Sequence, residues 1–199
     1  MCELQAYRGP DDSGVKDLGR VCLGSRRLSI IDLSSAGHMP MSDDSGRWWI
    51  TYNGESYNFA EVRDELEGLG HRFRSNTDTE VVLHAWMQWG SDCLQRFVGM
   101  FAFAIHDTHT DEVSLIRDRY GKKPLYYSRI GGFVAFSSEI KGLTAHRSDL
   151  RINQQALLEW FLYRNVDALA SRTLFEGVDA VLPGHVVTIS PRGTRSSCY

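Results

Sequence analysis

One stretch, residues 52–55 (Tyr-Asn-Gly-Glu), constrains the fold of this sequence more than any other. It ends an apolar run, residues 48–52, whose residue types are typical of a buried strand. An Asn-Gly pair after a strand normally predicts a hairpin turn. Residues 59–66, however, repeat apolar side chains at helical spacing. We therefore expect Asn53 and Gly54 to lie in a connection from a strand to a helix.

The expected helix runs from Asn58 to Leu69. Asn58 is a favourable N-cap residue, Glu61 completes a capping-box pattern, and Gly70 is a suitable C-cap. A strand-to-helix connection can direct a side-chain amide and a backbone N–H at one point, which is how an oxyanion hole is built. A purely structural turn is the alternative that these residues leave open.

The composition limits the class of protein. The chain has 199 residues, of which 42% are hydrophobic and 24% charged, and this is ordinary for one globular domain. A net charge of -3 offers no basic surface for nucleic acid, and no apolar run reaches membrane-spanning length. The cysteines are dispersed, which favours free cytoplasmic thiols over disulfides or a zinc site. His106 and His109 flank a predicted turn, where a solvated loop is preferred to a metal site.

The remaining segments group by type. Two hairpins are expected, one pairing residues 100–106 with 112–117 and the other pairing 125–127 with 133–136. Further helices are expected at 80–89, 92–97, 139–143 and 154–163, and further strands at 21–23, 28–31, 71–74 and 185–189. Neighbouring helices among several hairpins predict an α+β fold in which sheets and helices are segregated.

Eight short motifs occur along the chain in a recognisable order. They are Arg8-Gly9-Pro10-Asp11-Asp12, Arg27-Leu28-Ser29-Ile30-Ile31-Asp32, Tyr52-Asn53-Gly54-Glu55, Thr77-Asp78-Thr79-Glu80-Val81, Gly99-Met100-Phe101-Ala102-Phe103-Ala104, Arg117-Asp118-Arg119 with Gly121-Lys122-Lys123-Pro124, Ser138-Glu139-Ile140-Lys141 and Leu182-Pro183-Gly184-His185. Each motif is weak alone, but their order is specific. From Arg8 onward the chain resembles the class II glutamine amidotransferase domain of bacterial-type glutamine-hydrolysing asparagine synthetases.

The resemblance implies a fold and an activity for residues 1–199. The fold is the four-layer αββα sandwich of two antiparallel sheets found in N-terminal-nucleophile hydrolases. The activity is release of ammonia from L-glutamine, for ATP-dependent amidation of aspartate by a synthetase domain that this chain does not include. Expected partners are glutamine and the synthetase domain or protein that accepts ammonia, with no nucleic acid and no membrane. No metal and no cofactor are expected in this chain, because ATP and Mg²⁺ belong to the synthetase domain.

The resemblance also assigns residues. In the family, a cysteine freed by removal of the initiator methionine attacks the glutamine amide, and its α-amino group acts as base. This nucleophile corresponds to Cys2, and the oxyanion hole to Asn53 and Gly54. Glutamine would be bound by Arg27, Leu28, Ser29, Ile30, Ile31, Asn53, Gly54, Glu55 and Asp78.

Within this set, the Arg27 guanidinium would hold the α-carboxylate, and Asp78 and Glu55 would lie near the α-amino group. The structural alternatives are a surface ion pair for Arg27, a helix N-cap for Asp78 and a solvated loop acid for Glu55. For Arg117, Asp118 and the two lysines at 122–123, an ion-pair cluster in a turn is expected.

The N-terminal segment departs from the family pattern. Relatives place a strand, a loop and a helix between the nucleophile and Arg-Gly-Pro-Asp, whereas here only residues 3–7 separate Cys2 from Arg8. A six-residue step spans at most about 20 Å. Two alternatives therefore stay open: Met1 is an internal residue of a longer protein, or Cys2 is a true nucleophile. We expect the first strand of the fold to be missing, which would leave an unpaired sheet edge and lower stability.

Other departures are smaller. Ser25 replaces a common histidine and Ser56 replaces an apolar residue, which bears on substrate affinity rather than on fold. A Ser-Gly-Gly-x-Asp-Ser pyrophosphate loop does not occur in the sequence, so ATP binding is not expected here. Two functions remain: an active glutaminase domain, or a catalytically inactive truncated remnant that binds glutamine or a partner without turnover.

Overall fold

The structure is a computed structural model that describes residues 1–29, 32, 34–147, 149–164 and 171–199. The α-helices are α1 (Phe59–Gly68), α2 (Asp78–Trp89), α3 (Ile140–Leu143) and α4 (Gln154–Tyr163), and the 3₁₀ helices are η1 (Cys2–Arg8), η2 (Ser35–Gly37) and η3 (Gly90–Gln95). The strands are β1 (Asp12–Asp17), β2 (Cys22–Arg27), β3 (Met41–Ser42), β4 (Trp48–Ser56), β5 (Gly99–Asp107), β6 (Glu112–Arg117), β7 (Tyr126–Ile130), β8 (Phe133–Ser137), β9 (Val178–Ala180), β10 (His185–Ser190) and β11 (Gly193–Cys198).

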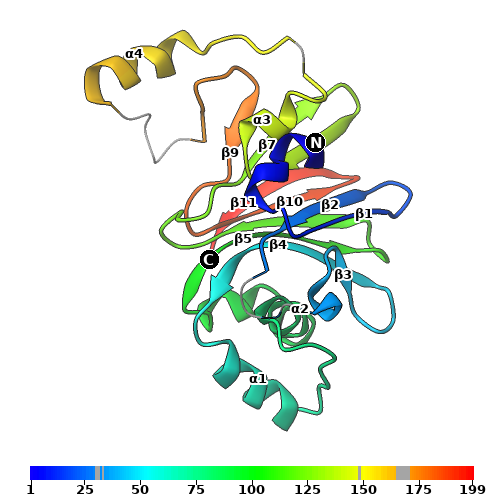
Figure 1. The fold of residues 1–199 in the computed structure, drawn as a ribbon. Helices are drawn as coiled ribbons and strands as arrows, with labels where there is room; N and C mark the ends of the chain where they lie inside the picture. Colours follow the sequence, from blue (N-terminus) through cyan, green and yellow to red (C-terminus); the bar gives the residue numbers. More distant parts are fainter. Residues whose placement is uncertain (30–31, 33, 148, 165–170) are drawn as a thin grey trace.

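A six-stranded antiparallel sheet forms the centre of the molecule, in the order β11-β10-β6-β5-β4-β3. Its longest pairing is β4 with β5, which runs from Trp48 opposite Asp107 to Ser56 opposite Gly99. Helices α1 and α2 cover one face of this sheet (Figure 1). Alternate residues of β5, including Phe101 and Phe103, pack there against the buried face of α2.

Two smaller sheets, β1-β2 and β8-β7-β9, lie over the opposite face (Figure 1). A second apolar cluster, which includes Ala102, Ala104, Leu115 and Leu125, fills the layer between the sheets. Helices η1, α3 and α4 lie beyond the smaller sheets (Figure 1). The predicted αββα order of layers is therefore confirmed.

The second sheet layer is interrupted between β2 and β8. Among the described strands, β2 pairs only with β1, and β8 pairs only with β7, while Arg27 at the end of β2 also forms an isolated bridge with Pro10. Both strands thus end their sheets with an unpaired edge, as expected for a layer that lacks one strand. The contacts of η1 with β2 and with α3 place this short helix next to the interruption.

Strand β4 continues further than predicted. Asn53 and Gly54 lie inside β4, opposite Ala102 and Phe101, and the strand ends at Ser56. A Cβ atom at residue 54 would lie 2.5 Å from the Met100 carbonyl oxygen. Glycine is therefore required here by the close approach of β5, and not by a turn. The prediction that Asn53 and Gly54 lie in a strand-to-helix connection was therefore wrong, because the strand ends at Ser56, four residues later than predicted.

Asn58 precedes α1 as predicted, but its side chain does not cap the helix. Its Nδ2 donates to the Arg96 carbonyl oxygen at 2.9 Å, and its Oδ1 accepts from the Val98 backbone N–H at 2.8 Å. The amide therefore bridges the start of α1 to the segment that leads into β5. A capping-box pattern in the sequence cannot distinguish a side chain that caps a helix from one that bridges to another segment.

Other predicted elements differ in detail. Residues 71–74 form no regular strand, and β2 spans residues 22–27 instead of 21–23, while the predicted strand at 28–31 includes residues outside the described part. Strands β1 and β11 were not predicted, because their polar sequences carry no apolar alternation. Both hairpins and the helices predicted at 80–89, 139–143 and 154–163 are confirmed. Of the segment predicted at 92–97, residues 92–95 belong to the 3₁₀ helix η3.

Arg117 and Asp118 organise a turn through backbone contacts rather than through an ion-pair cluster. The Arg117 guanidinium donates to the carbonyl oxygens of Lys123, Gly121 and Val181. The Asp118 carboxylate accepts from the backbone N–H groups of residues 101, 120, 122 and 123. The expected ion-pair cluster was therefore wrong.

His106 is buried in β5, with 1% of its surface exposed, so the predicted solvated loop applies to His109 alone. Among the described residues, no group of three or more His, Cys, Asp or Glu side chains has the geometry to hold a metal ion. In the same part of the chain, no helix combines the length and the apolar character that crossing a membrane requires.

Candidate functional site

A cavity of about 1510 Å³ lies beneath the interruption between β2 and β8. Most of the predicted site residues line it, namely Cys2, Arg27, Leu28, Asn53, Gly54, Glu55 and Asp78. Ser29 is half-buried and does not line it, and Ile30 and Ile31 lie outside the described residues. The structure thus brings together residues that are up to 76 positions apart, counting from 2 to 78.

The backbone N–H of Gly54 points away from β5. Phe101, which lies opposite Gly54, uses both its backbone groups on the β6 side: its N–H donates to Asp118 Oδ2 and its C=O accepts from the Asp118 N–H. In an antiparallel ladder such a pair shares no hydrogen bonds. The Gly54 N–H is therefore directed at the other edge of β4, where it can serve a ligand in the cavity.

Asn53 presents its side chain on the face of β4 that is turned toward the smaller sheets, as does Thr51, whose hydroxyl donates to the Gly24 carbonyl oxygen of β2. The Asn53 Nδ2 makes a long hydrogen bond of 3.4 Å to Ser138 Oγ, just after β8. Because this hydrogen bond is weak, the Asn53 amide can reorient toward a developing negative charge at a small cost in free energy.

Asp78 is buried and is the first residue of α2. Its Oδ2 accepts from the Ser56 backbone N–H at 3.0 Å. Burial raises the pKa of Asp78 above its ordinary value, and the negative charge of Glu55 adds to this, while the hydrogen bond from Ser56 opposes it. The cap of α2 is Thr77, whose hydroxyl accepts from the Glu80 N–H, so the alternative role of Asp78 as N-cap was wrong.

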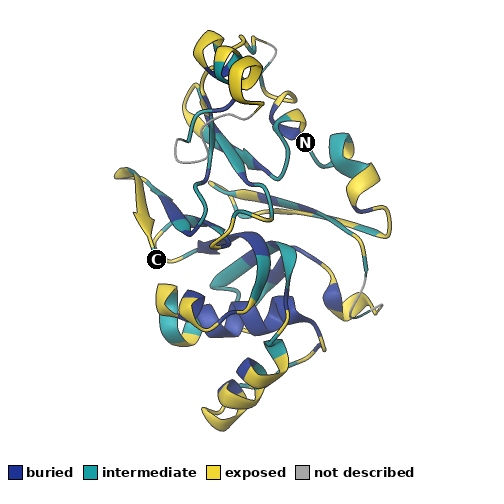
Figure 2. Ribbon diagram, turned by 90° about the vertical axis from the view of Figure 1, so that its left-hand side faces the viewer, coloured by how far each residue is buried: buried dark blue, intermediate teal, exposed yellow. Residues whose placement is uncertain are grey.

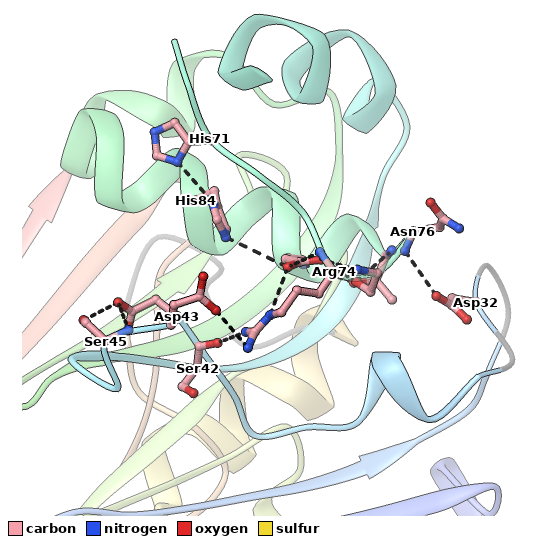
Figure 3. Close-up of polar contacts among 12 residues, drawn as sticks. Asp32, Ser42, Asp43, Ser45, His71, Arg74, Asn76 and His84 are labelled. Atoms are coloured by element: carbon pink, nitrogen blue, oxygen red, sulfur yellow. Dashed lines mark hydrogen bonds and ion pairs between the residues drawn. The ribbon is translucent and has the colours of Figure 1, made fainter. Parts of the chain in front are cut away.

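The turn that precedes Asp78 is held by Glu80. Its buried carboxylate accepts from the backbone N–H groups of Arg74 and Ser75 and from the Ser75 hydroxyl, at 2.7–3.1 Å. Figure 3 shows this network, in which the Asn76 N–H also donates to Asp32 Oδ2 at 3.2 Å. The turn therefore fixes both Asp78 and one end of the loop that follows Arg27.

Arg27 reaches from β2 into the same loop. Its guanidinium donates to the carbonyl oxygens of Ser34, at 3.1 Å, and of Asp32. A guanidinium has five N–H donors, so the remaining N–H groups can donate to a carboxylate in the cavity. Gly37 leaves room for this group, because a Cβ there would lie 2.1 Å from Arg27 Nη2.

Cys2 lies in η1, whose far end is tied to Glu139 by Arg8, at 2.6 Å, and by the Tyr7 hydroxyl. Its Sγ lies 2.5 Å from the position that a Cβ of Gly24 would occupy. The sulfur therefore faces β2 at the cavity wall.

Ser138 and Thr51 are site residues to which sequence reasoning gave no role. Ser138 stands in one of the eight motifs, and this was the only available signal. Thr51 carries no signal, since threonine in a strand is expected for packing alone. Their contacts with Asn53 and Gly24 depend on how two sheets stack, which no local pattern encodes.

Comparison with known proteins agrees with this geometry. A family model described as "Glutamine amidotransferase domain" matches residues 1–199. The chain is 36% identical over 200 residues to Asparagine synthetase [glutamine-hydrolyzing] 3 of Bacillus subtilis (strain 168), covering 97% of this chain and 32% of that protein. It is 38% identical over 193 residues to Asparagine synthetase [glutamine-hydrolyzing] 1 of the same organism, covering 97% of this chain and 30% of that protein.

A solved structure shows the same fold at lower identity. Glutamine phosphoribosylpyrophosphate amidotransferase from B. subtilis superimposes with a TM-score of 0.61 and 21% identity, over 89% of this chain and 34% of that one. The chain spans about a third of the length of these curated relatives. Since the family model covers the whole chain, the chain belongs to the glutamine amidotransferase domain family.

Proposed function

We propose that this domain binds L-glutamine and hydrolyses its side-chain amide, releasing ammonia for a synthetase polypeptide that amidates aspartate. The observation that carries the proposal is the placement of the Asn53 amide and the Gly54 N–H beside one cavity that also contains Arg27 and Asp78. Two donors at one end and a cation with carboxylates at the other match the reacting amide and the charged end of glutamine.

Each charged group has one task in this proposal. Arg27 binds the α-carboxylate, and Asp78 with Glu55 binds the α-amino group. The amide then projects toward Asn53 and Gly54, which stabilise the oxyanion that forms when a nucleophile attacks the carbonyl carbon. The sulfur of Cys2 is the nucleophile that this chain offers at the cavity wall.

The acceptor reaction rests on the relatives, whose names describe glutamine-hydrolysing asparagine synthetases. ATP and Mg²⁺ are proposed to act on the synthetase polypeptide and not in this domain. We also propose a cytoplasmic site of action, which the four free cysteines of the structure support.

A second candidate is glutamine binding without turnover. One observation favours it: Cys2 lies in the short 3₁₀ helix η1, and its Sγ faces Gly24 of β2. A nucleophile of this type needs its own α-amino group as base. The state of the N-terminus therefore separates the two candidates.

The test is release of ammonia from glutamine by the purified chain and by its Cys2→Ala variant, together with the intact mass of each. Turnover by a chain that begins at Cys2, lost in the variant, is the expected result. Binding of glutamine in calorimetry without turnover by either chain would establish the second candidate. A chain that neither binds nor hydrolyses glutamine would contradict both.

A further inference from the structure

Helix α4 exposes apolar side chains where a surface helix normally exposes charged ones. Of its residues only Ala156 is buried. The exposed fractions are 58% for Leu158, 60% for Phe161, 64% for Leu162 and 74% for Tyr163, with 38% for Trp160. Figure 2 shows this exposed helix at the end of the molecule.

Helix α1 of the same chain provides the contrast. It buries Val62 and Leu66, and the residues on its exposed face include Glu61, Asp64 and Glu65. This is the pattern of a helix that has already buried its apolar face. In α4 the exposed face is apolar, so packing against the described part of this chain does not bury the apolar residues of this helix.

Within the part of the chain that the structure describes, the anchoring of α4 leaves this apolar surface exposed. The helix is held at its start by the backbone bond from Asn153 N–H to the Leu174 carbonyl oxygen, 2.9 Å, and along one side by Glu159, which pairs with Arg172 at 2.5 Å. Its acidic residue is thus already neutralised. At about 200 Å² for each whole aromatic side chain, the three aromatic residues alone expose on the order of 300 Å². The largest apolar patch of a monomeric protein typically measures about 300–600 Å² and is often functional.

We propose that α4 is the docking surface for the ammonia-consuming synthetase polypeptide, an inference that rests on the proposed function. This chain spans 32% and 30% of two relatives that are named as synthetases, so in them the matched domain shares one chain with a polypeptide about twice its length. A domain that shares a chain with such a polypeptide has a surface that contacts it, and exposed apolar side chains gain free energy when that contact removes them from water. Interfaces between domains of one chain typically bury 600–1,500 Å², which a patch of this size can supply as one of its two sides.

The test measures how well α4 is covered. The chain is joined, in place of the segment that it matches, to the remainder of B. subtilis Asparagine synthetase 3. Phe161→Cys is labelled with a maleimide in the free chain and in the joined chain, and mass spectrometry reads the labelled peptide. Val98→Cys is the matched control, because Val98 is 61% exposed and Phe161 is 60% exposed. Synthesis of asparagine from ammonium shows that the joined synthetase is folded.

We expect labelling at position 161 to slow at least tenfold in the joined chain, with no change at position 98. Equal labelling at position 161 in both chains would overturn the inference. So would slow labelling in the free chain that depends on its concentration, because a second copy would then be the partner. Protection at position 161 without glutamine hydrolysis would count against the proposed function and leave the docking surface in place.

Discussion

The backbone N–H of Ser56 donates to Oδ2 of Asp78 at 3.0 Å, and this bond joins the end of β4 to the first residue of α2. The Gly54 N–H, two residues earlier in the strand, points to the same edge of β4. The proposed oxyanion donor and the proposed partner of the substrate ammonium group are therefore positioned by one strand and one helix start. A change at either residue acts on a shared geometry.

The first prediction concerns Asn53. Replacing it with alanine removes one of two proposed donors to the oxyanion, so kcat for ammonia release should fall about 100- to 1,000-fold with little change in KM. Stability should hardly change, because the Asn53 amide makes only a 3.4 Å bond to Ser138. Asn58→Ala is the matched control: it removes an amide that bridges Arg96 and Val98, and so should lower stability and leave kcat unchanged. Equal kcat values for the two variants would refute the assignment.

The second prediction concerns Asp78. As Asn, residue 78 keeps an acceptor for Ser56 and loses the charge that holds the substrate ammonium group, so KM for glutamine should rise at least tenfold, which is about 1.4 kcal/mol. Because burial raises the pKa of Asp78, glutamine binding by the wild type should weaken on acidification at a higher pH than an ordinary aspartate would give. Calorimetric titration across pH 4–7 checks this, with the exposed Asp64→Asn as control. If the D78N variant keeps the wild-type pH dependence of glutamine binding, a group other than Asp78 is responsible for it.

The third prediction concerns two glycines. Gly54→Ala places a methyl group 2.5 Å from the Met100 carbonyl oxygen, and we expect the free energy of unfolding to fall by about 3 kcal/mol. Gly68→Ala lies at the end of α1, and apart from its chain neighbours and the backbone of its own helix no described heavy atom comes within 4 Å of its new methyl group. It should raise stability by about 0.5–1 kcal/mol. Urea unfolding of both variants measures the difference, and a tolerated Gly54→Ala would show that β4 and β5 can separate.

The fourth prediction concerns Glu80. Glu80→Gln removes the charge that holds the backbone of Arg74 and Ser75 and buries two amide protons in its place, so stability should fall by about 2–3 kcal/mol. The exposed Glu67→Gln in α1 should change it by less than about 0.5 kcal/mol. Urea unfolding gives both values. If the two variants unfold alike, the turn before α2 is held by other contacts.

The fifth prediction is a loss of stability in mild acid. Burial lowers the pKa of His106, and also that of His84, below the ordinary value of 6.5. The unfolded chain then binds protons at a pH at which the folded protein does not, so stability is lost as the pH falls below 6.5, until the lowered pKa is reached. The His106→Leu variant should lose less stability than wild type between pH 7 and pH 5, whereas the exposed His109→Leu should not. Parallel slopes for all three proteins would contradict the assignment.

Apolar periodicity predicted only that sheets and helices are segregated. The αββα layers and the site residues were implied by the resemblance, which rests on motifs that are continuous in the chain, and the structure places most of those residues around one cavity. Where prediction from the sequence failed, the deciding contacts are long-range. Asn58 had the right type for a cap, but a segment forty residues later, at Val98, takes its side chain. Strand β11 is polar and exposed, and exists because β10 pairs with it. Asp118 belongs to a charged motif, but its partners are backbone N–H groups.

Gly54 has a consequence for how related sequences are compared. Its lack of a side chain is required by the contact with Met100 and Phe101, whether or not an oxyanion ever forms beside it. A lineage that had lost glutamine hydrolysis would still retain this glycine, because replacing it would cost the fold. Asn53, whose amide makes one weak contact, carries no such structural requirement. Among descendants of this domain, a substitution at position 53 rather than at position 54 is therefore expected to indicate the loss of glutamine hydrolysis.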